Sequence, residues 1–333
     1  MVSSCDARPD GSLRPILPAA ALLTLAMGLS EAAFCQADDA GVPTPESNAN
    51  TADDATLSLR IRRQVRLDDA RRPGFRSQTT THAWPAGETA IVICDMWDDH
   101  WCEAAADRVA EFAPRLNRMI AHARERGVLI IHCPSSVTDF YSGTPARERA
   151  REAKRIAFDT GEVLRPDPKP WVFLDPDREP PLPVSADEGD AVCESGDEVD
   201  YVWTRQIDAI AIDDRDAVTD NDEALYLMRD RGIRHVLVTG VHLNMCVLGR
   251  PFGIRQLVER GYDVALVRDL TDGLYDPAES PFVSHFDGNR LLIQHIERHW
   301  CGSTTSGDID GEPVFRFKAD WSPPDTPQTA TDD

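Results

Sequence analysis

Five short runs of apolar residues, separated by helical stretches and loops, constrain the fold of this chain more than any other feature. They lie at residues 89–94, 128–133, 209–213, 235–240 and 263–269. The runs are rich in β-branched residues and lack the polar alternation of a half-exposed strand. Such runs are typical of strands that are buried on both faces of a sheet.

Segments with helical periodicity lie between and beyond these runs, at residues 104–126, 145–158, 221–231, 252–260 and 281–299. Buried strands that alternate with helices fold as a parallel sheet covered on both sides. We therefore expect an α/β protein, a three-layer α/β/α fold with a central, mostly parallel sheet of Rossmann type. Residues 57–67 (LSLRIRRQVRL) alternate instead, which predicts an added edge strand.

The charge balance limits the possible partners. The chain of 333 residues has 35 Lys and Arg against 57 Asp and Glu, a formal net charge of −22. Such an excess of carboxylates repels phosphate, which argues against nucleic acid and against an anionic membrane surface as partners. The length suits one α/β domain of roughly 200–250 residues with extensions.

The N-terminus has the pattern of a secretory signal peptide at residues 1–37. Arg8 and Arg14 precede an apolar run at residues 16–29, and small residues follow. The run is shorter than the roughly 20 residues that span a bilayer, although a retained N-terminal anchor is the alternative. Cleavage is expected after Ala37, and acylation of Cys35 is disfavoured because the bulky Phe34 precedes it. The pattern predicts an exported protein, periplasmic or secreted.

The remaining chain divides by composition. Residues 38–56 are polar, which predicts a flexible linker, and residues 319–333 have the character of a disordered tail. The folded domain is expected at residues 57–318. Within it, residues from about 164 to 200 are rich in Pro and acid, which predicts an irregular insertion near the edge of the sheet where the strands end.

The eight cysteines are too sparse for a disulfide scaffold. No two of them have C-x-x-C spacing, which argues against a zinc site of that kind and against a thiol-redox protein. In an oxidising compartment two cysteines of the domain can pair, but their spacing leaves the partners open.

Three places near strand ends carry reactive side chains. Asp95 follows the first run, Arg205 lies just before the third, and Cys246 follows the fourth at the expected start of a helix. A thiol at a helix N-terminus has its thiolate favoured by the helix dipole. With an acid and a cation beside it, such a thiol becomes a nucleophile with a base and an orienting charge.

Two segments resemble the isochorismatase-like cysteine hydrolase superfamily, which includes nicotinamidase-related amidases. They are TAIVICDMWDDHWC at residues 89–102 and VLVTGVHLNMCVLGRPFGIRQLVERGYDVALVRDLTDG at residues 236–273, and the likeness spans about residues 85–300. The resemblance implies an isochorismatase-like fold and a hydrolase that cleaves a C–N bond of a small, non-peptide amide without a cofactor. Cys246 favours this amidase branch over vinyl-ether hydrolysis.

The resemblance also implies roles for individual residues. Cys246 matches the nucleophile, which forms a thioester, and Asp95 matches the general base. Arg205 is the best match to a catalytic lysine of the family, and as an arginine it keeps the charge but cannot readily release a proton. An unusual cis peptide is expected between Val241 and His242, and the backbone N–H groups of His242 and Cys246 would form the oxyanion hole.

A group of aromatic and histidine residues near the predicted strand ends is expected to line the substrate pocket. Trp97 stands where the family often has Gln, and a Trp there would add a flat apolar wall. The expected pocket residues are Trp97, His100, Trp101, His132 and Tyr141. Each of them can instead simply pack in the core.

Simpler interpretations remain open at this stage. Cys246 can be an inert buried thiol, Asp95 a helix cap and Arg205 a surface ion-pair residue. Asp98, His100 and His132 can form a metal site, but their spacing does not match the family's ligands and we expect none. The alternative function is a non-catalytic small-molecule-binding protein on the same fold. Homo-oligomers are common in this superfamily, so a homo-oligomer is possible here.

Overall fold

A computed structural model describes residues 55–67, 71, 74–159, 178–184 and 202–321. The chain divides into two compact units, residues 1–47 and 48–333, and all of the described residues belong to the second. The predicted signal peptide lies outside the described residues, as do nearly all of the predicted linker and tail and most of the predicted insertion.

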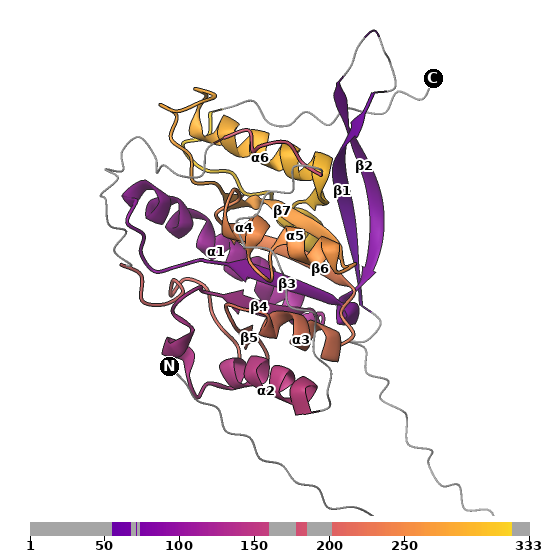
Figure 1. The fold of residues 1–333 in the computed structure, drawn as a ribbon, viewed down its shortest axis with the longest axis vertical. Helices are drawn as coiled ribbons and strands as arrows, with labels where there is room; N and C mark the ends of the chain where they lie inside the picture. The colour runs from indigo at the N-terminus through magenta and orange to yellow at the C-terminus, as the bar shows by residue number, and fades with distance from the viewer. Residues whose placement is uncertain (1–54, 68–70, 72–73, 160–177, 185–201, 322–333) are drawn as a thin grey trace, which may run out of the picture. The chain divides into compact units, whose positions relative to one another are not determined.

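A mixed sheet of eight strands, in the order β2-β1-β8-β7-β6-β3-β4-β5, forms the centre of this unit (Figure 1). The strands from β8 to β5 are parallel, whereas β1 is antiparallel to both β2 and β8. The strands are β1 (Thr56–Arg66), β2 (Phe75–Pro85), β3 (Thr89–Cys94), β4 (Leu129–Cys133), β5 (Ala217–Val218), β6 (His235–Val241), β7 (Asp263–Asp272) and β8 (Gly302–Thr304).

Helices cover both faces of the sheet. One face packs against α1 (Glu103–Glu125) and α7 (Ser306–Asp310). The other face packs against α2 (Pro145–Asp159), α3 (Glu223–Asp230), α4 (Cys246–Gly249), α5 (Ile254–Glu259) and α6 (His285–His299). Two 3₁₀ turns lie at Ala86–Glu88 and Thr138–Tyr141. The prediction of a three-layer α/β/α fold is confirmed.

The central strand β3 shows why the apolar runs lack alternation. Its residues Ala90, Val92 and Cys94 belong to the core cluster under α2 to α6, whereas Ile91 and Ile93 belong to the cluster under α1. All five side chains are fully buried. Because both faces of the strand meet a helical layer, every position is apolar.

The predicted third strand at residues 209–213 is wrong, because no strand forms there and the corresponding strand is β5. Ile210 is buried in the cluster under α1, so its apolar character comes from packing. The backbone of this stretch is held by side chains: Ala211 N donates to Asn117 Oδ1 over 3.0 Å, and Gln206 Nε2 donates to Ile210 O over 3.1 Å.

The predicted edge strand at residues 57–67 is β1, but it lies inside the sheet between β2 and β8. Leu57, Leu59 and Ile61 are buried, and β2 continues the sheet outward in an uninterrupted antiparallel register from Thr56 opposite Pro85 to Arg66 opposite Phe75. Nothing in the sequence of β2 predicted a strand, because residues 75–83 are exposed and carry no apolar pattern.

Part of the predicted insertion, residues 178–184, is anchored on the helical layer. Glu179 is buried and contacts three partners: Arg255 Nε at 2.7 Å, His295 Nε2 at 2.8 Å and Trp300 Nε1 at 2.8 Å. Arg255 lies on α5 and His295 on α6, so one carboxylate joins this segment to two helices. Among the residues described, no helix has the length and apolar character that a membrane span needs.

Candidate active site

The carboxyl ends of β3 and β6 meet at one edge of the sheet and bring Asp95 and Cys246 together. The two strands are neighbours, with Cys94 opposite Gly240. Gly240 has φ +100°, and a Cβ there would lie 2.1 Å from the carbonyl oxygen of Cys94. Only glycine therefore allows β6 to approach β3 this closely just before the chain turns toward Cys246.

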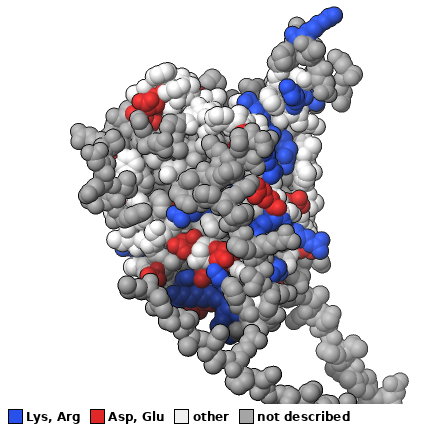
Figure 2. Space-filling model, in the orientation of Figure 1, with Lys and Arg blue, Asp and Glu red and all other residues white. Residues whose placement is uncertain are grey.

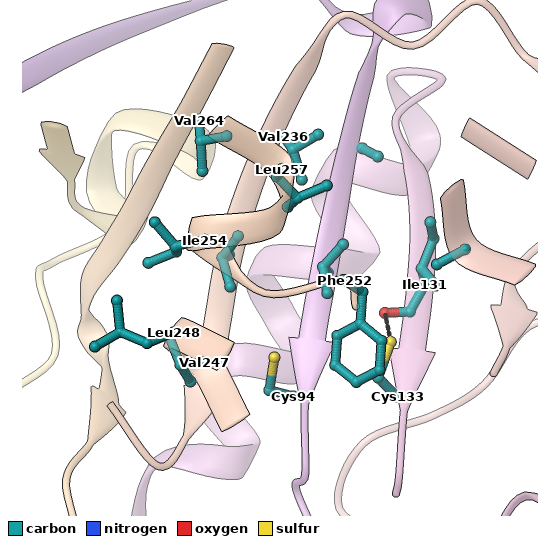
Figure 3. Close-up of a cluster of buried hydrophobic side chains, with 14 of the residues drawn as sticks. Cys94, Ile131, Cys133, Val236, Val247, Leu248, Phe252, Ile254, Leu257 and Val264 are labelled. Atoms are coloured by element: carbon teal, nitrogen blue, oxygen red, sulfur yellow. Dashed lines mark hydrogen bonds between the residues drawn. The ribbon is translucent and has the colours of Figure 1, made fainter. Parts of the chain in front are cut away.

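Cys246 begins the short helix α4, which lies against the sheet. Val247 and Leu248 of α4 pack with Phe252 and Ile254 over β3, β4 and β6 (Figure 3). Before the helix, the peptide bond between Val241 and His242 is cis, and the carbonyl of His242 accepts from Met245 N at 3.0 Å and from Val247 N at 3.2 Å. This tight loop holds Cys246, which is 5% exposed, at the end of β6.

Asp95 is held in an unusual conformation directly after β3. Its φ of +47° lies in the left-handed region, which is uncommon for a residue other than glycine. The backbone N–H of Asp95 donates to Cys133 O over 3.0 Å, and its Oδ1 accepts from Ser135 N over 2.8 Å. The carboxylate is fully buried, and the thiol of Cys246 lies beside it and interacts with it.

The cation beside this pair is Arg250. It lies four residues after Cys246, where its backbone N–H donates to Cys246 O over 3.2 Å and closes the helix. The guanidinium interacts with both the Cys246 sulfur and the Asp95 carboxylate, and also with the carboxylate of Asp220 beyond β5. A Cβ at Gly253 would lie 2.9 Å from Arg250 N, so a glycine is also needed to pack the turn that follows.

The electrostatics of the trio keep the thiol protonated at rest. Burial raises the pKa of Cys246 well above the ordinary thiol value, and the nearby Asp95 raises it further, whereas Arg250 lowers it. Burial also raises the pKa of Asp95, against the opposing effects of Cys246, Arg250 and Ser135.

The structure places Arg205, the sequence-predicted cation, elsewhere. Its guanidinium binds Asp208 through Nε at 3.0 Å and Nη2 at 2.9 Å, and it lies 3.7 Å from Asp98. The cation Arg250 influences the pKa values of both Asp95 and Cys246. The spacing of Arg250 from Cys246, one helical turn, is the signal that could have identified it.

Three stacked rings lie beside the Asp95 loop. The rings of Trp97 and Trp203 stack with centroids 4.3 Å apart, and His100 stacks on Trp203 at 5.7 Å. Trp97 Nε1 donates to Ser135 O over 3.2 Å, which ties this stack to the loop that binds Asp95. Trp97 and His100, two of the predicted pocket residues, thus lie beside the Asp95 loop together with Trp203.

Two neutral imidazoles face one another next to this stack. The rings of His100 and His242 meet edge to face at 5.0 Å. Burial lowers the pKa of His100 to about 4, and burial together with His100 lowers that of His242 well below the usual value. His100 Nδ1 accepts from Cys102 N over 3.0 Å, so the ring proton is on Nε2. Cys102 itself is disulfide-bonded.

A buried carboxylate supports the loop that carries His242. Asp272, at the end of β7, accepts at Oδ2 from Arg108 Nε over 2.6 Å and at Oδ1 from His285 Nε2 over 2.8 Å. Its carbonyl oxygen accepts from Leu243 N over 2.8 Å. These contacts hold the pKa of Asp272 well below the usual range, against the effect of burial.

The other predicted pocket residues are engaged in contacts within the protein. Both ring nitrogens of His132 are engaged, Nδ1 with Gln206 Oε1 at 2.8 Å and Nε2 with Asp216 Oδ2 at 3.0 Å. The hydroxyl of Tyr141 accepts from Gln206 N over 2.8 Å. Trp101 packs against a small cluster that contains Met245 and Leu274 near the nucleophile.

Asp98, His100 and His132, the residues of the alternative metal-site interpretation, have other contacts in the structure. Asp98 accepts from Thr204 N at 2.8 Å and from Thr204 Oγ1 at 2.6 Å, His132 is engaged with Asp216, and His100 lies in the ring stack. Within the described ranges, no group of three or more His, Cys, Asp or Glu is arranged to hold a metal ion.

Several solved structures are similar to this chain. They include a cysteine hydrolase from Pseudomonas syringae (18% identity, 68% of this chain and 92% of that chain covered, TM-score 0.41). A pyrazinamidase from Pyrococcus horikoshii in complex with zinc is also similar (17% identity, 66% of this chain and 99% of that chain covered, TM-score 0.34). So is an N-carbamoylsarcosine amidase from Thermoplasma acidophilum (13% identity, 67% of this chain and 99% of that chain covered, TM-score 0.35). No curated protein matches the chain significantly in sequence.

The chain also matches a protein family. The sequence profile of the isochorismatase domain matches residues 89–283, more than half of the chain. That range begins at the first residue of β3 and contains Asp95, Cys246 and Arg250. The chain therefore belongs to the isochorismatase family of hydrolases.

Proposed function

We propose that this protein is an exported cysteine hydrolase that cleaves the C–N bond of a small-molecule amide through a thioester on Cys246. The observation that carries the proposal is the trio of buried Cys246, buried Asp95 and partly buried Arg250 at the edge of the sheet. A thiol, a carboxylate with a raised pKa and a cation that cannot lose its proton are the groups that such a reaction needs.

In the first half of the reaction, Asp95 accepts the thiol proton as the sulfur of Cys246 attacks the amide carbon. The negative charge moves from the carboxylate to the sulfur, and Arg250 lies beside both positions and stabilises the charge throughout. Asp95 then returns the proton to the nitrogen, the C–N bond breaks, and the amine leaves the thioester behind.

In the second half, a water molecule attacks the thioester carbon and transfers a proton to Asp95. The C–S bond breaks, the carboxylic acid departs, and the proton returns to the sulfur of Cys246. Backbone N–H groups of His242 and Cys246 are the proposed donors to the oxygen that becomes negatively charged in both steps. One such donor typically contributes 10²–10³ in rate.

The surroundings favour a small, uncharged, flat substrate. Trp97 and Trp203 offer ring faces, and His100 and His242 are neutral because their pKa values are lowered. Stacking on such rings requires a planar group. A neutral imidazole offers a hydrogen bond but no charge that could pair with an ionised substrate group. Pyrazinamide and nicotinamide, which are flat and uncharged, form a rational first panel, with an N-carbamoyl amino acid, which carries a carboxylate, as the charged comparison.

The decisive experiment measures ammonia release from this panel together with the mass of the intact protein during turnover. We expect turnover by the natural protein, none by Cys246→Ala, and a covalent acyl adduct on Cys246 that accumulates in Asp95→Asn when an activated ester replaces the amide. Ligand binding without turnover or adduct in any form would instead indicate the non-catalytic binding protein.

Export is a separate part of the proposal and rests on the sequence of residues 1–37. N-terminal sequencing of the protein from the periplasm or medium is expected to begin at Asp38 or close to it. A product that starts at Met1 and remains in the cell would contradict it.

A further inference from the structure

The outermost strand of the sheet, β2, is unusually exposed. In the described part of the chain it pairs only with β1, so one edge of its backbone faces outward. Residues 75–83 are exposed along the whole length, which means that neither face of the strand is covered. A strand of this kind is a template for pairing with another chain.

The middle of β2 lacks the features that protect an edge strand, although Arg76 and Pro85 lie near its two ends. The residues from Ser77 to Thr81 read SQTTT, with no charge, proline or glycine, and threonine has high β propensity. Exposed edges are normally blocked by charges, prolines, bulges or short length. Here the strand is 11 residues long, and its register with β1 is uninterrupted.

We propose that β2 is a self-association surface and pairs antiparallel with β2 of a second copy, about a two-fold axis at Thr80. Thr80 is the middle residue of the strand, so this register uses its full length and places Thr80 opposite Thr80 and Arg76 opposite Trp84. A two-fold pairing of this type is closed and produces a dimer instead of a filament. The two sheets then form one continuous sheet.

The distribution of charge on the hairpin favours the antiparallel orientation of the second copy. The hairpin sequence at residues 56–85 has seven Arg and two Asp, a net charge of +5 in a chain of −22 (Figure 2). Four of these arginines, Arg62, Arg63, Arg66 and Arg76, lie toward the turn of the hairpin. Antiparallel pairing places this basic end of each copy beside the opposite end of the partner's hairpin.

An exposed carboxylate, that of Asp263, lies near that opposite end. There Trp84 stacks on His235 with centroids 4.8 Å apart, and His235 contacts the carboxylate of Asp263, whose side chain is 72% exposed. Because directly opposed residues in a sheet share a face, Arg76 of one copy would lie on the Trp84 side of the other, toward Asp263. A parallel pairing of the two β2 strands would instead place Arg76 of one copy against Arg76 of the other. In the proposed antiparallel register, the two copies of Arg76 lie about 27 Å apart along the strand.

Sedimentation velocity of the full chain tests the proposal. We expect a species of twice the chain mass, and at least about a fivefold rise in the dimer dissociation constant for Thr80→Lys and for Thr80→Glu, because each places like charges directly opposite. Mixing the two variants should restore the dimer as a heterodimer. Asp263→Arg should also weaken the dimer, because it places a like charge near Arg76 of the second copy. High salt should reduce the difference between this variant and the natural protein.

The matched control is Ser58→Lys, which adds the same charge to an exposed position of the hairpin on the inner strand β1. It should leave the dissociation constant unchanged, and circular dichroism should show that all variants remain folded. A monomeric natural protein at tens of micromolar would overturn the proposal. So would a dimer that Thr80→Lys and Thr80→Glu leave intact, or variants that fail to recombine.

Discussion

At the scale of single residues, Arg250 is the position whose substitution separates the structural assignment from the sequence-based one. Arg250 lowers the pKa of Asp95, so its removal should raise that pKa further. The base is active only when ionised, and activity is lost as pH falls through its pKa. Arg250→Met should therefore shift the acid limb of the pH–rate profile to higher pH and reduce kcat/KM by about 10².

Arg205→Met is the control for this prediction. It removes an equally charged side chain, but one that binds Asp208 and Asp98 at the surface, where ion pairs contribute little. Its pH–rate profile should coincide with that of the natural protein. A shift for Arg205→Met without one for Arg250→Met would return the catalytic role to Arg205.

At the scale of elements, the approach of β6 to β3 depends on Gly240. Gly240→Ala would place a methyl group 2.1 Å from Cys94 O at a φ that disfavours side chains, so the two strands must separate. We expect a loss of about 3 kcal/mol or more in the free energy of unfolding, measured by urea denaturation. Loss of activity should accompany it, since both strands carry the site.

Gly232→Ala is the matched control, because Gly232 also has positive φ, +66°, but no atom lies within 4 Å of the added Cβ. Only the backbone conformation then costs stability, by about 1 kcal/mol. Equal losses for the two variants would show that the contact between β6 and β3 is less tight than the structure indicates.

At the scale of the whole molecule, one buried carboxylate couples a segment of the predicted insertion to the domain. Interactions with His295, Arg255 and Trp300 lower the pKa of Glu179 to about 2, although burial alone would raise it. A carboxyl group with a lowered pKa stabilises the fold above its unfolded pKa, and the stabilisation is lost as pH falls through the folded value. Here the window runs from about pH 4.5 down to about pH 2.

Glu179→Gln should therefore lower the free energy of unfolding by about 3 kcal/mol at pH 7, with a difference that shrinks as the pH falls below about 4.5. Chemical denaturation at several pH values measures this. Glu152→Gln, which removes an exposed carboxylate paired with Arg155 on α2, should change little at any pH. If the loss in the free energy of unfolding for Glu179→Gln did not depend on pH, packing and not the charge of Glu179 would hold residues 178–184 on the domain.

The local pattern of apolar residues in the sequence was sufficient to predict much of the architecture. Fully buried strands such as β3, β4, β6 and β7 are recognisable because both of their faces require apolar side chains. Asp95 and Cys246 could be placed together from the sequence, because the carboxyl ends of parallel strands meet at one edge. Residues 209–213 misled because one buried isoleucine in a loop resembles a strand residue.

Other features depended on contacts between distant segments, which no local pattern records. The strand β2 forms on the backbone groups of β1 without burying a face of its own, so its sequence carries no apolar signal. Arg250 and Arg205 are equally charged in the sequence, and only the fold directs one toward Cys246 and the other toward Asp208. The buried strands follow from the sequence alone, because burial on both faces requires a run of apolar residues. Which distant groups pair depends on the tertiary structure, because pairing requires that they lie close together in space.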